Sequence, residues 1–168
     1  MDDKKNPRDQ LWALIKNIRF GMFTTRHANG HFHSHPMTTQ NKLIEADDRL
    51  WFFMSRGSET VRSIAAQPTV NVAYADPGQD RYVSVSGEAK VVEDRAKMEA
   101  LWTTMSQAWF PGGTQDPDLA LVGVRVIHAH YWDVKENKLT QMYEMAKAAM
   151  TGTTPSEMGE SGELRLTT

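Results

Sequence analysis

The sequence predicts an α+β fold that is mainly β, in which about six strands, mostly antiparallel, close fully or partly into a barrel flanked by helices. The first observation is a series of short runs rich in β-branched and aromatic residues, separated by turn signals such as Asn29-Gly30. The second is that the connections between these runs are short. Short connections favour closure over an open sheet, because closure removes exposed strand edges.

The chain begins with a predicted helix and a predicted hairpin. Residues 8–18 place apolar side chains at the spacing of an amphipathic helix. Residues 21–26, rich in Phe and Thr, are typical of a strand. Asn29-Gly30 indicates a tight turn, because both central positions of such a turn need positive φ. Residues 31–44 are therefore expected to return antiparallel to the strand before them.

A strand that leads into a helix follows. Residues 50–54 are continuously apolar, as in a strand covered on both faces. Residues 58–67 are predicted to form a helix, because Ser58 is a capping residue, Glu59 lies in the first turn and the pattern stops before Pro68.

Three further strands are predicted between residues 69 and 134. Residues 69–75 end at the turn signal Asp76-Pro77-Gly78. Residues 82–92 alternate with period two, which is typical of a strand with one wetter face. Residues 121–134 carry a long strand pattern.

The remaining segments are two helices, a loop and a tail. Asp94 caps a helix that is predicted to run to Met105, and residues 139–150 are the last predicted helix. Residues 109–113 are predicted as a loop that carries Trp109 and a second large aromatic ring. The Gly/Ser/Thr/Glu-rich tail, residues 151–168, is expected to be mobile until something such as a partner subunit holds it.

Composition narrows the classes of protein. A chain of 168 residues predicts one domain, at residues 1–150 ahead of the tail. A net charge of -2 gives no electrostatic reason to expect nucleic acid binding. The sequence has no apolar run long enough for a membrane span and no apolar signal-peptide core near its first residues, which favours a cytoplasmic protein. With no cysteine, disulfides, thiolate metal sites and thiol catalysis are excluded.

The histidines are the first candidate for chemistry. His31, His33 and His35 alternate along a predicted strand and so share one face, and His128 and His130 repeat the spacing. Imidazoles on one face could hold Zn²⁺. Strand geometry spaces alternate residues about 7 Å apart, which makes a poor tetrahedral cage. Half-exposed strand histidines are therefore the favoured interpretation, and no metal ligand is assigned.

The loop before the second helix is the next candidate. Ser55, Arg56 and Ser58 combine hydroxyls, a guanidinium and a helix N-terminus, which suits a phosphate or another anion. An ordinary helix cap, which Ser58 alone would supply, explains the same residues equally well. The Trp109-Phe110 pair beside Pro-Gly is better placed to cover a ligand or fill a subunit interface than to enter the core.

Familiar catalytic signatures are missing from the sequence. It contains no Gly-x-Ser-x-Gly elbow, no Gly-rich dinucleotide fingerprint and no phosphate-binding lysine loop. No residue is therefore named as catalytic.

Eight short segments, taken in order, resemble the FMN-binding split-barrel family that includes pyridoxamine 5′-phosphate oxidase, and most closely its bacterial general stress protein 26 branch. The segments are 22–26 (MFTTR), 33–37 (HSHPM), 50–55 (LWFFMS), 58–61 (SETV), 70–72 (VNV), 82–87 (YVSVSG), 109–111 (WFP) and 131–133 (YWD). The resemblance extends from about residue 11 to the end of the chain.

The resemblance implies a six-stranded antiparallel split β-barrel that forms a homodimer, with a flavin (FMN, or FAD) at the subunit interface. It implies a phosphate near residues 35–40 and 55–60, and an isoalloxazine ring along the Pro-Met and Phe-Met pairs, approached by two tryptophans. The implied cofactor-binding residues are His35, Pro36, Met37, Gln40, Phe53, Met54, Ser55, Arg56, Ser58, Thr60, Trp109 and Trp132. The implied function is a general stress protein that transfers hydride or electrons at the flavin to an unknown substrate, without true pyridoxamine phosphate oxidase activity.

The chain departs from the family pattern at the implied phosphate site. His35 stands where the branch usually has arginine, Thr60 stands where it usually has lysine, and Gln40 and Glu59 stand where related oxidases have basic residues. Losing two contacts to a charged group would weaken binding by about 3 kcal/mol, near a hundredfold. The alternative is therefore a non-enzymatic stress or interaction protein that keeps the barrel without tight flavin binding. A haem or metal binder that uses the histidines is a further alternative.

Overall fold

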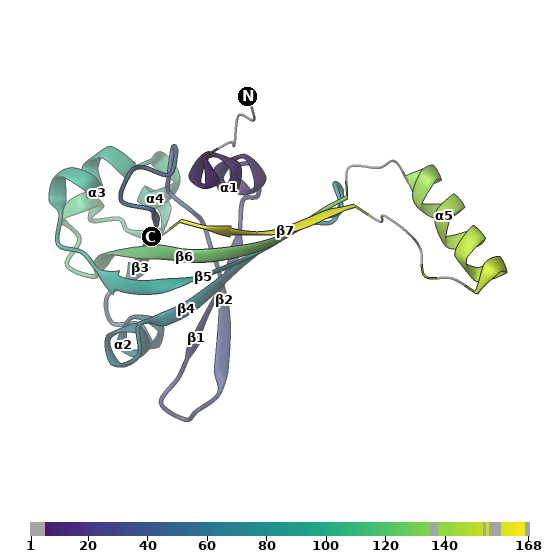
Figure 1. Ribbon diagram of the computed structural model, residues 1–168. Coiled ribbons are helices and arrows are strands. Elements are labelled where there is room, and N and C mark those ends of the chain that lie inside the picture. The colour runs from purple at the N-terminus through teal and green to yellow at the C-terminus, as the bar shows by residue number, and fades with distance from the viewer. Residues whose placement is uncertain (1–5, 135–137, 153, 155–158, 167–168) are drawn as a thin grey trace.

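The structure, a computed structural model, describes residues 6–134, 138–152, 154 and 159–166. Its centre is one curled antiparallel sheet, a half-barrel, with the strand order β2-β1-β4-β5-β6-β3 and with β7 paired to β6 (Figure 1). The strands are β1 (Gly21–Arg26), β2 (Phe32–Met37), β3 (Arg49–Ser55), β4 (Thr69–Asp76), β5 (Arg81–Val91), β6 (Leu119–Asp133) and β7 (Glu160–Arg165). The predicted six-stranded path is confirmed, and β7 is an addition to it.

Helices flank the sheet. They are α1 (Pro7–Ile15), α2 (Glu59–Ala66), α3 (Arg95–Leu101), α4 (Thr104–Trp109), the 3-10 helix η1 (Gly113–Gln115) and α5 (Lys138–Thr151). Figure 1 shows α5 standing apart from the body of the molecule, joined to it beyond the far ends of β6 and β7. None of the helices that the structure describes is long and apolar enough to cross a membrane.

The main core lies inside the curl of the sheet. Phe23 of β1 and Phe52 of β3 are fully buried and meet edge to face, with ring centroids 5.3 Å apart. Leu11 and Ile15 bury one side of α1 against this core. A second cluster, at the other face of β3, packs under α3. Its buried members are Trp51, Met98, Leu101, Leu119 and Leu121.

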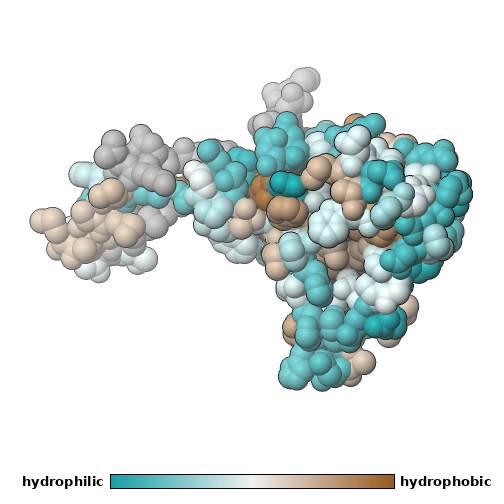
Figure 2. Space-filling model, turned by 180° about the vertical axis from the view of Figure 1, so that it is seen from behind, coloured by the Kyte–Doolittle hydropathy of each residue, from teal (hydrophilic) through white to brown (hydrophobic). Residues whose placement is uncertain are grey.

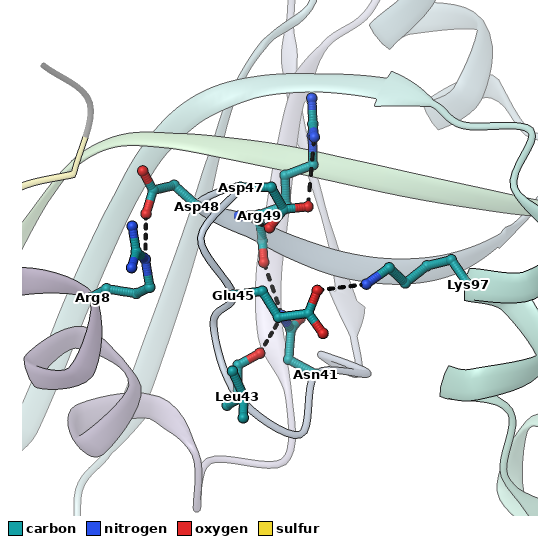
Figure 3. A network of polar contacts seen from close by, with 8 residues as sticks. All are labelled: Arg8, Asn41, Leu43, Glu45, Asp47, Asp48, Arg49 and Lys97. Carbon is teal, nitrogen blue, oxygen red and sulfur yellow. Dashed lines mark hydrogen bonds and ion pairs between the residues drawn. The ribbon is translucent and has the colours of Figure 1, made fainter.

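Polar contacts hold the loop between β2 and β3 (Figure 3). The Asn41 side chain donates to the Arg49 carbonyl at 2.8 Å and accepts from the Trp51 N–H at 2.7 Å. Arg8 of α1 pairs with Asp48 at 2.6 Å, and Lys97 of α3 pairs with Glu45 at 2.7 Å. The strand predicted over residues 31–44 is therefore shorter and ends at Met37. Beyond Met37 the chain forms hydrogen bonds and ion pairs with β3, α1 and α3 instead of pairing with β1.

Two other predictions need correction. The helix predicted from Asp94 to Met105 is two helices, because Trp102 has extended backbone and the Thr103 hydroxyl caps a new helix by accepting from the Ser106 N–H. Trp109 consequently ends α4 and does not begin a loop.

Within the predicted tail, residues 160–165 are held by the chain itself, because they form β7 along β6. Leu164 is 7% exposed and packs into the main core, which explains why this short segment is held in place. The rest of the predicted tail lies largely outside the described residues.

Candidate functional site

A cavity of about 390 Å³ lies between the β1–β2 hairpin, the end of β3 and the start of α2. The hairpin surface around it is largely hydrophilic (Figure 2). The cavity is lined by His27, His33, His35, Met37, Met54, Ser55, Ser58, Glu59 and Thr60. We refer to it as the α2 cavity.

Strand pairing brings the histidines of the α2 cavity together. The Asn29-Gly30 turn, with Gly30 at φ 84°, returns the chain so that the His27 N–H donates to the His31 carbonyl at 2.9 Å. The rings of His27 and His33 then stack face to face, with centroids 3.9 Å apart and planes 3° from parallel. The His35 ring lies 6.4 Å from that of His27. His31, which sequence reasoning placed in the same row, does not line the cavity.

The N-terminus of α2 forms the opposite wall of the cavity. Ser58 caps the helix, because its hydroxyl accepts from the Val61 N–H at 3.2 Å, as the sequence predicted. Helix N-termini leave backbone N–H groups without intrahelical acceptors and carry partial positive charge, which favours an anion. Thr60 is buried there, and the half-exposed carboxylate of Glu59 lies 3.3 Å from Nδ1 of His27.

His27 carries a buried polar atom that needs a partner. Its side chain is 5% exposed, and its Nε2 makes no hydrogen bond within the described part of the chain. The same holds for Oγ1 of Thr25, two residues earlier on β1. Buried polar atoms in native proteins are nearly always paired, so these two atoms mark a part of the hairpin whose hydrogen bonding is incomplete. His27 was missed as a candidate, although it continues the alternation of buried residues along β1.

The structure gathers half of the predicted cofactor-binding residues at the α2 cavity. Those that line it are His35, Met37, Met54, Ser55, Ser58 and Thr60. Those that do not are Pro36, Gln40, Phe53, Arg56, Trp109 and Trp132.

Arg56 belongs to a different set of contacts. Its guanidinium donates to the Glu93 carboxylate at 2.7 Å and to the Leu119 carbonyl at 3.1 Å. The neighbouring Ser55 hydroxyl donates to Asp118 at 2.9 Å, and together with the Gly57 N–H it holds the pKa of Asp118 below its usual value. The loop is thus fixed to the start of β6, and its arginine is engaged away from the cavity.

The other predicted residues outside the cavity are dispersed. Phe53 packs against Trp102, with ring centroids 5.4 Å apart, on the opposite side of β3 from the main core. The Gln40 side chain donates to the Thr38 carbonyl, and Pro36 is exposed on β2. Trp109 is 79% exposed at the end of α4.

Trp132 lies at a second hollow, of about 290 Å³, between β6 and β7. The tryptophan is 49% exposed. The hollow is lined by His130, Tyr131, Trp132, Ser161, Gly162 and Glu163.

Comparison with known proteins identifies a family and several similar proteins. A family model described as pyridoxamine 5′-phosphate oxidase like matches residues 6–156. A general stress protein 26 from Jannaschia sp. CCS1 is 26% identical, with a TM-score of 0.72 over 98% of this chain and 99% of that one. The general stress FMN/FAD binding protein of Xanthomonas citri is 30% identical, with a TM-score of 0.66 over 80% and 93% of the two chains. Protein bli-3 of Neurospora crassa is 24% identical over 163 residues, which are 89% of this chain and 78% of that protein.

Proposed function

The chain belongs to the pyridoxamine 5′-phosphate oxidase-like family, and on that premise we propose that it binds a flavin, FMN or FAD, with the phosphate in the α2 cavity. The observation that carries the proposal is the α2 cavity itself, in which the N-terminus of α2 faces the hairpin histidines and two methionines. The Xanthomonas citri relative, described as an FMN/FAD binding protein, supports the choice of ligand.

The residues of the cavity suit the two parts of a flavin nucleotide. The backbone N–H groups at the start of α2, with the hydroxyls of Ser58 and Thr60, would hold the phosphate. Met37 and Met54 offer an apolar, polarisable surface to the ring. The cavity volume lies within the range of small-molecule sites, and the wall formed by the hairpin histidines adds ring nitrogens as hydrogen-bond partners.

The charge around the phosphate predicts modest affinity. Glu59 brings a carboxylate to the cavity, and the Arg56 guanidinium is paired with Glu93. Binding therefore depends on helix and hydroxyl donors, each of which contributes about 1–3 kcal/mol to a charged partner. The same two observations favour the alternative function, a stress or interaction protein that keeps the split barrel without tight flavin binding.

The proposed reaction divides between the flavin and the protein. A bound flavin supplies hydride or electron transfer, and the protein supplies position and electrostatics. We propose an oxidoreductase role with an unknown substrate, because electron or hydride transfer is the chemistry that a bound flavin supplies. The proposal does not extend to pyridoxamine phosphate oxidation.

We further propose that a second copy of the chain covers the open side of the flavin. Exposed apolar side chains support this proposal, because an isolated helix gains little from presenting them to water. On α5, which stands apart in Figure 1 and carries hydrophobic surface in Figure 2, they are Met142, Tyr143, Met145 and Met150.

An FMN titration of the tag-free protein, its His27→Leu variant and its Arg56→Gln variant tests the site. His27→Leu removes both ring nitrogens at similar size, so affinity should fall about tenfold or more. Arg56→Gln changes an exposed pair outside the cavity and should leave affinity unchanged. Equal affinity of the wild type and His27→Leu would place the flavin elsewhere, and absence of binding to all three proteins would favour the alternative function.

A further inference from the structure

A second group of histidines lies on β6, far along the chain from the α2 cavity. His128 and His130 are two residues apart on one strand, so their side chains share a face of the sheet. β7 lies along this part of β6 (Figure 1). The two strands pair antiparallel, and the register sets Glu163 opposite His130. In the sequence, no carboxylate could be assigned beside these histidines. Pairing of β7 with β6 brings the Glu163 carboxylate there.

The side chains of these three residues converge. One ligand atom from each of His128, His130 and Glu163 lies within 4.8 Å of the other two. Nε2 of His130 is 3.9 Å from the Glu163 carboxylate. The two imidazole rings are 5.5 Å apart and nearly perpendicular, so they do not stack as His27 and His33 do.

We propose that His128, His130 and Glu163 bind a divalent transition metal ion that fastens β7 to β6. Two imidazole nitrogens and one carboxylate oxygen are the donor set of many zinc sites, with bonds of about 2.0–2.2 Å. Donors bound to one ion are roughly 3.3 Å apart, so small side-chain rotations from the observed spacing suffice. Nitrogen donors favour Zn²⁺, Ni²⁺, Co²⁺ or Cu²⁺ over Mg²⁺ and Ca²⁺, which prefer oxygen.

The neighbours of the cluster are compatible with a cation. Nε of Arg165 lies 3.4 Å from the Glu163 carboxylate, but its side chain is 79% exposed. An exposed pair of this kind contributes little to stability, so a metal ion can replace it at small cost. All three ligands are partly or largely exposed, which leaves room for water or a further ligand on the ion.

The fluorescence of Trp132 can be used to detect a metal ion at the same site. Its ring lies 6.4 Å from that of His130, on the same strand face. A paramagnetic ion such as Ni²⁺ or Cu²⁺ bound at the cluster should therefore quench its fluorescence. The inference does not depend on flavin binding, because none of the three ligands lines the α2 cavity.

Calorimetric titration with Zn²⁺ is the direct test, using tag-free protein that has been treated with chelator. We expect one ion per chain, with affinity about tenfold or more weaker in Glu163→Gln and in His128→Ala. His31→Ala is the matched control, because it removes an exposed strand-end histidine remote from the cluster and should bind as the wild type does. Circular dichroism should show all variants folded.

Two results would overturn the proposal. One is a Zn²⁺ affinity in Glu163→Gln and His128→Ala equal to that of the wild type. The other is half an ion per chain, which would require a site shared between two chains. As a second measurement, Ni²⁺ should quench wild-type fluorescence more than that of Trp132→Phe, and equal fractional quenching would contradict a site beside Trp132.

Discussion

Two regions of this chain carry histidines at the same sequence spacing, and their surroundings differ. At the α2 cavity, His33 and His35 lie beside His27, whose ring is buried, stacked on His33 and turned toward a helix N-terminus. At the β6–β7 cluster, defined as His128, His130 and Glu163, the rings are exposed or half-buried and meet a carboxylate.

The difference lies in what the tertiary structure sets opposite each pair. A helix N-terminus suits an anion, whereas an open pair of imidazoles beside a carboxylate suits a cation. Spacing along a strand fixes only which residues share a face. The partners on neighbouring elements decide the chemistry of that face.

The largest effect should come from truncating a fully buried side chain of the main core. Phe23 is fully buried on β1 and packs edge to face on Phe52. Phe23→Ala should lower the free energy of unfolding by about 3–5 kcal/mol, because it leaves a cavity in the main core. Urea denaturation measures this change. Met22→Ala, at an exposed neighbouring position, should cost far less, and similar losses would contradict the assigned packing.

A smaller loss of stability is expected from a truncation in β7. The same variant separates Zn²⁺ binding at the β6–β7 cluster from FMN binding at the α2 cavity. Leu164→Ala removes the buried anchor of β7, at an edge of the sheet, and should cost about 2 kcal/mol. Zn²⁺ affinity should fall with it, because Glu163 is then less firmly held beside His130. FMN affinity should stay unchanged, since β7 does not line the α2 cavity. Calorimetry with each ligand checks both, and a parallel loss of FMN binding would show that the regions are coupled.

A change of charge sharpens the account of the α2 cavity. Glu59→Gln removes a negative charge beside the proposed phosphate and should tighten FMN binding about two- to fivefold. Glu93→Gln is the matched control, because that carboxylate pairs with Arg56 outside the cavity. Fluorescence titration compares the variants. Equal effects of both would mean that only net charge matters.

The smallest effect concerns acid stability of the loop that leads into α2. Hydrogen bonds from Ser55 and Gly57 hold the pKa of Asp118 below its usual value, so the folded state favours the carboxylate. That contribution is present above the unfolded-state pKa, about 4, and is lost as the pH falls through the folded-state pKa. Asp118→Asn should therefore be less stable than the wild type at pH near 7, with the gap closing in acid. Urea midpoints at both pH values measure it, and a gap independent of pH would contradict the assignment.

Local signals predicted those parts of the fold and site that depend on neighbours in sequence. Asn29-Gly30 indicated the position of the β1–β2 turn but not its type, because Asn29 lacks the positive φ expected of it and the Gly30 N–H donates to the His27 carbonyl, which centres the turn on Ala28 and Asn29. Ser58 was identified as a cap, and its hydroxyl accepts from the Val61 N–H. Both features depend on a few adjacent residues, which is why the sequence sufficed.

Features that depend on distant partners were not predictable in the same way. Arg56 was predicted as a phosphate ligand, and nothing in the sequence indicated that the fold would set the Glu93 carboxylate beside its guanidinium. β7 has a short, polar sequence whose strand character comes from pairing with β6 and from burial of Leu164. The role of His27 depends on the placement of α2, whose Glu59 lies beside its ring, and Glu59 is distant from His27 in the sequence.

A visible absorption spectrum shows whether the α2 cavity holds a flavin. Tag-free protein is incubated with excess FMN and desalted, and the spectrum of the protein fraction is recorded for the wild type and His27→Leu. The account predicts flavin bands that co-elute with the wild type and are weaker with His27→Leu. A wild-type fraction without flavin, or equal retention by His27→Leu, would contradict it.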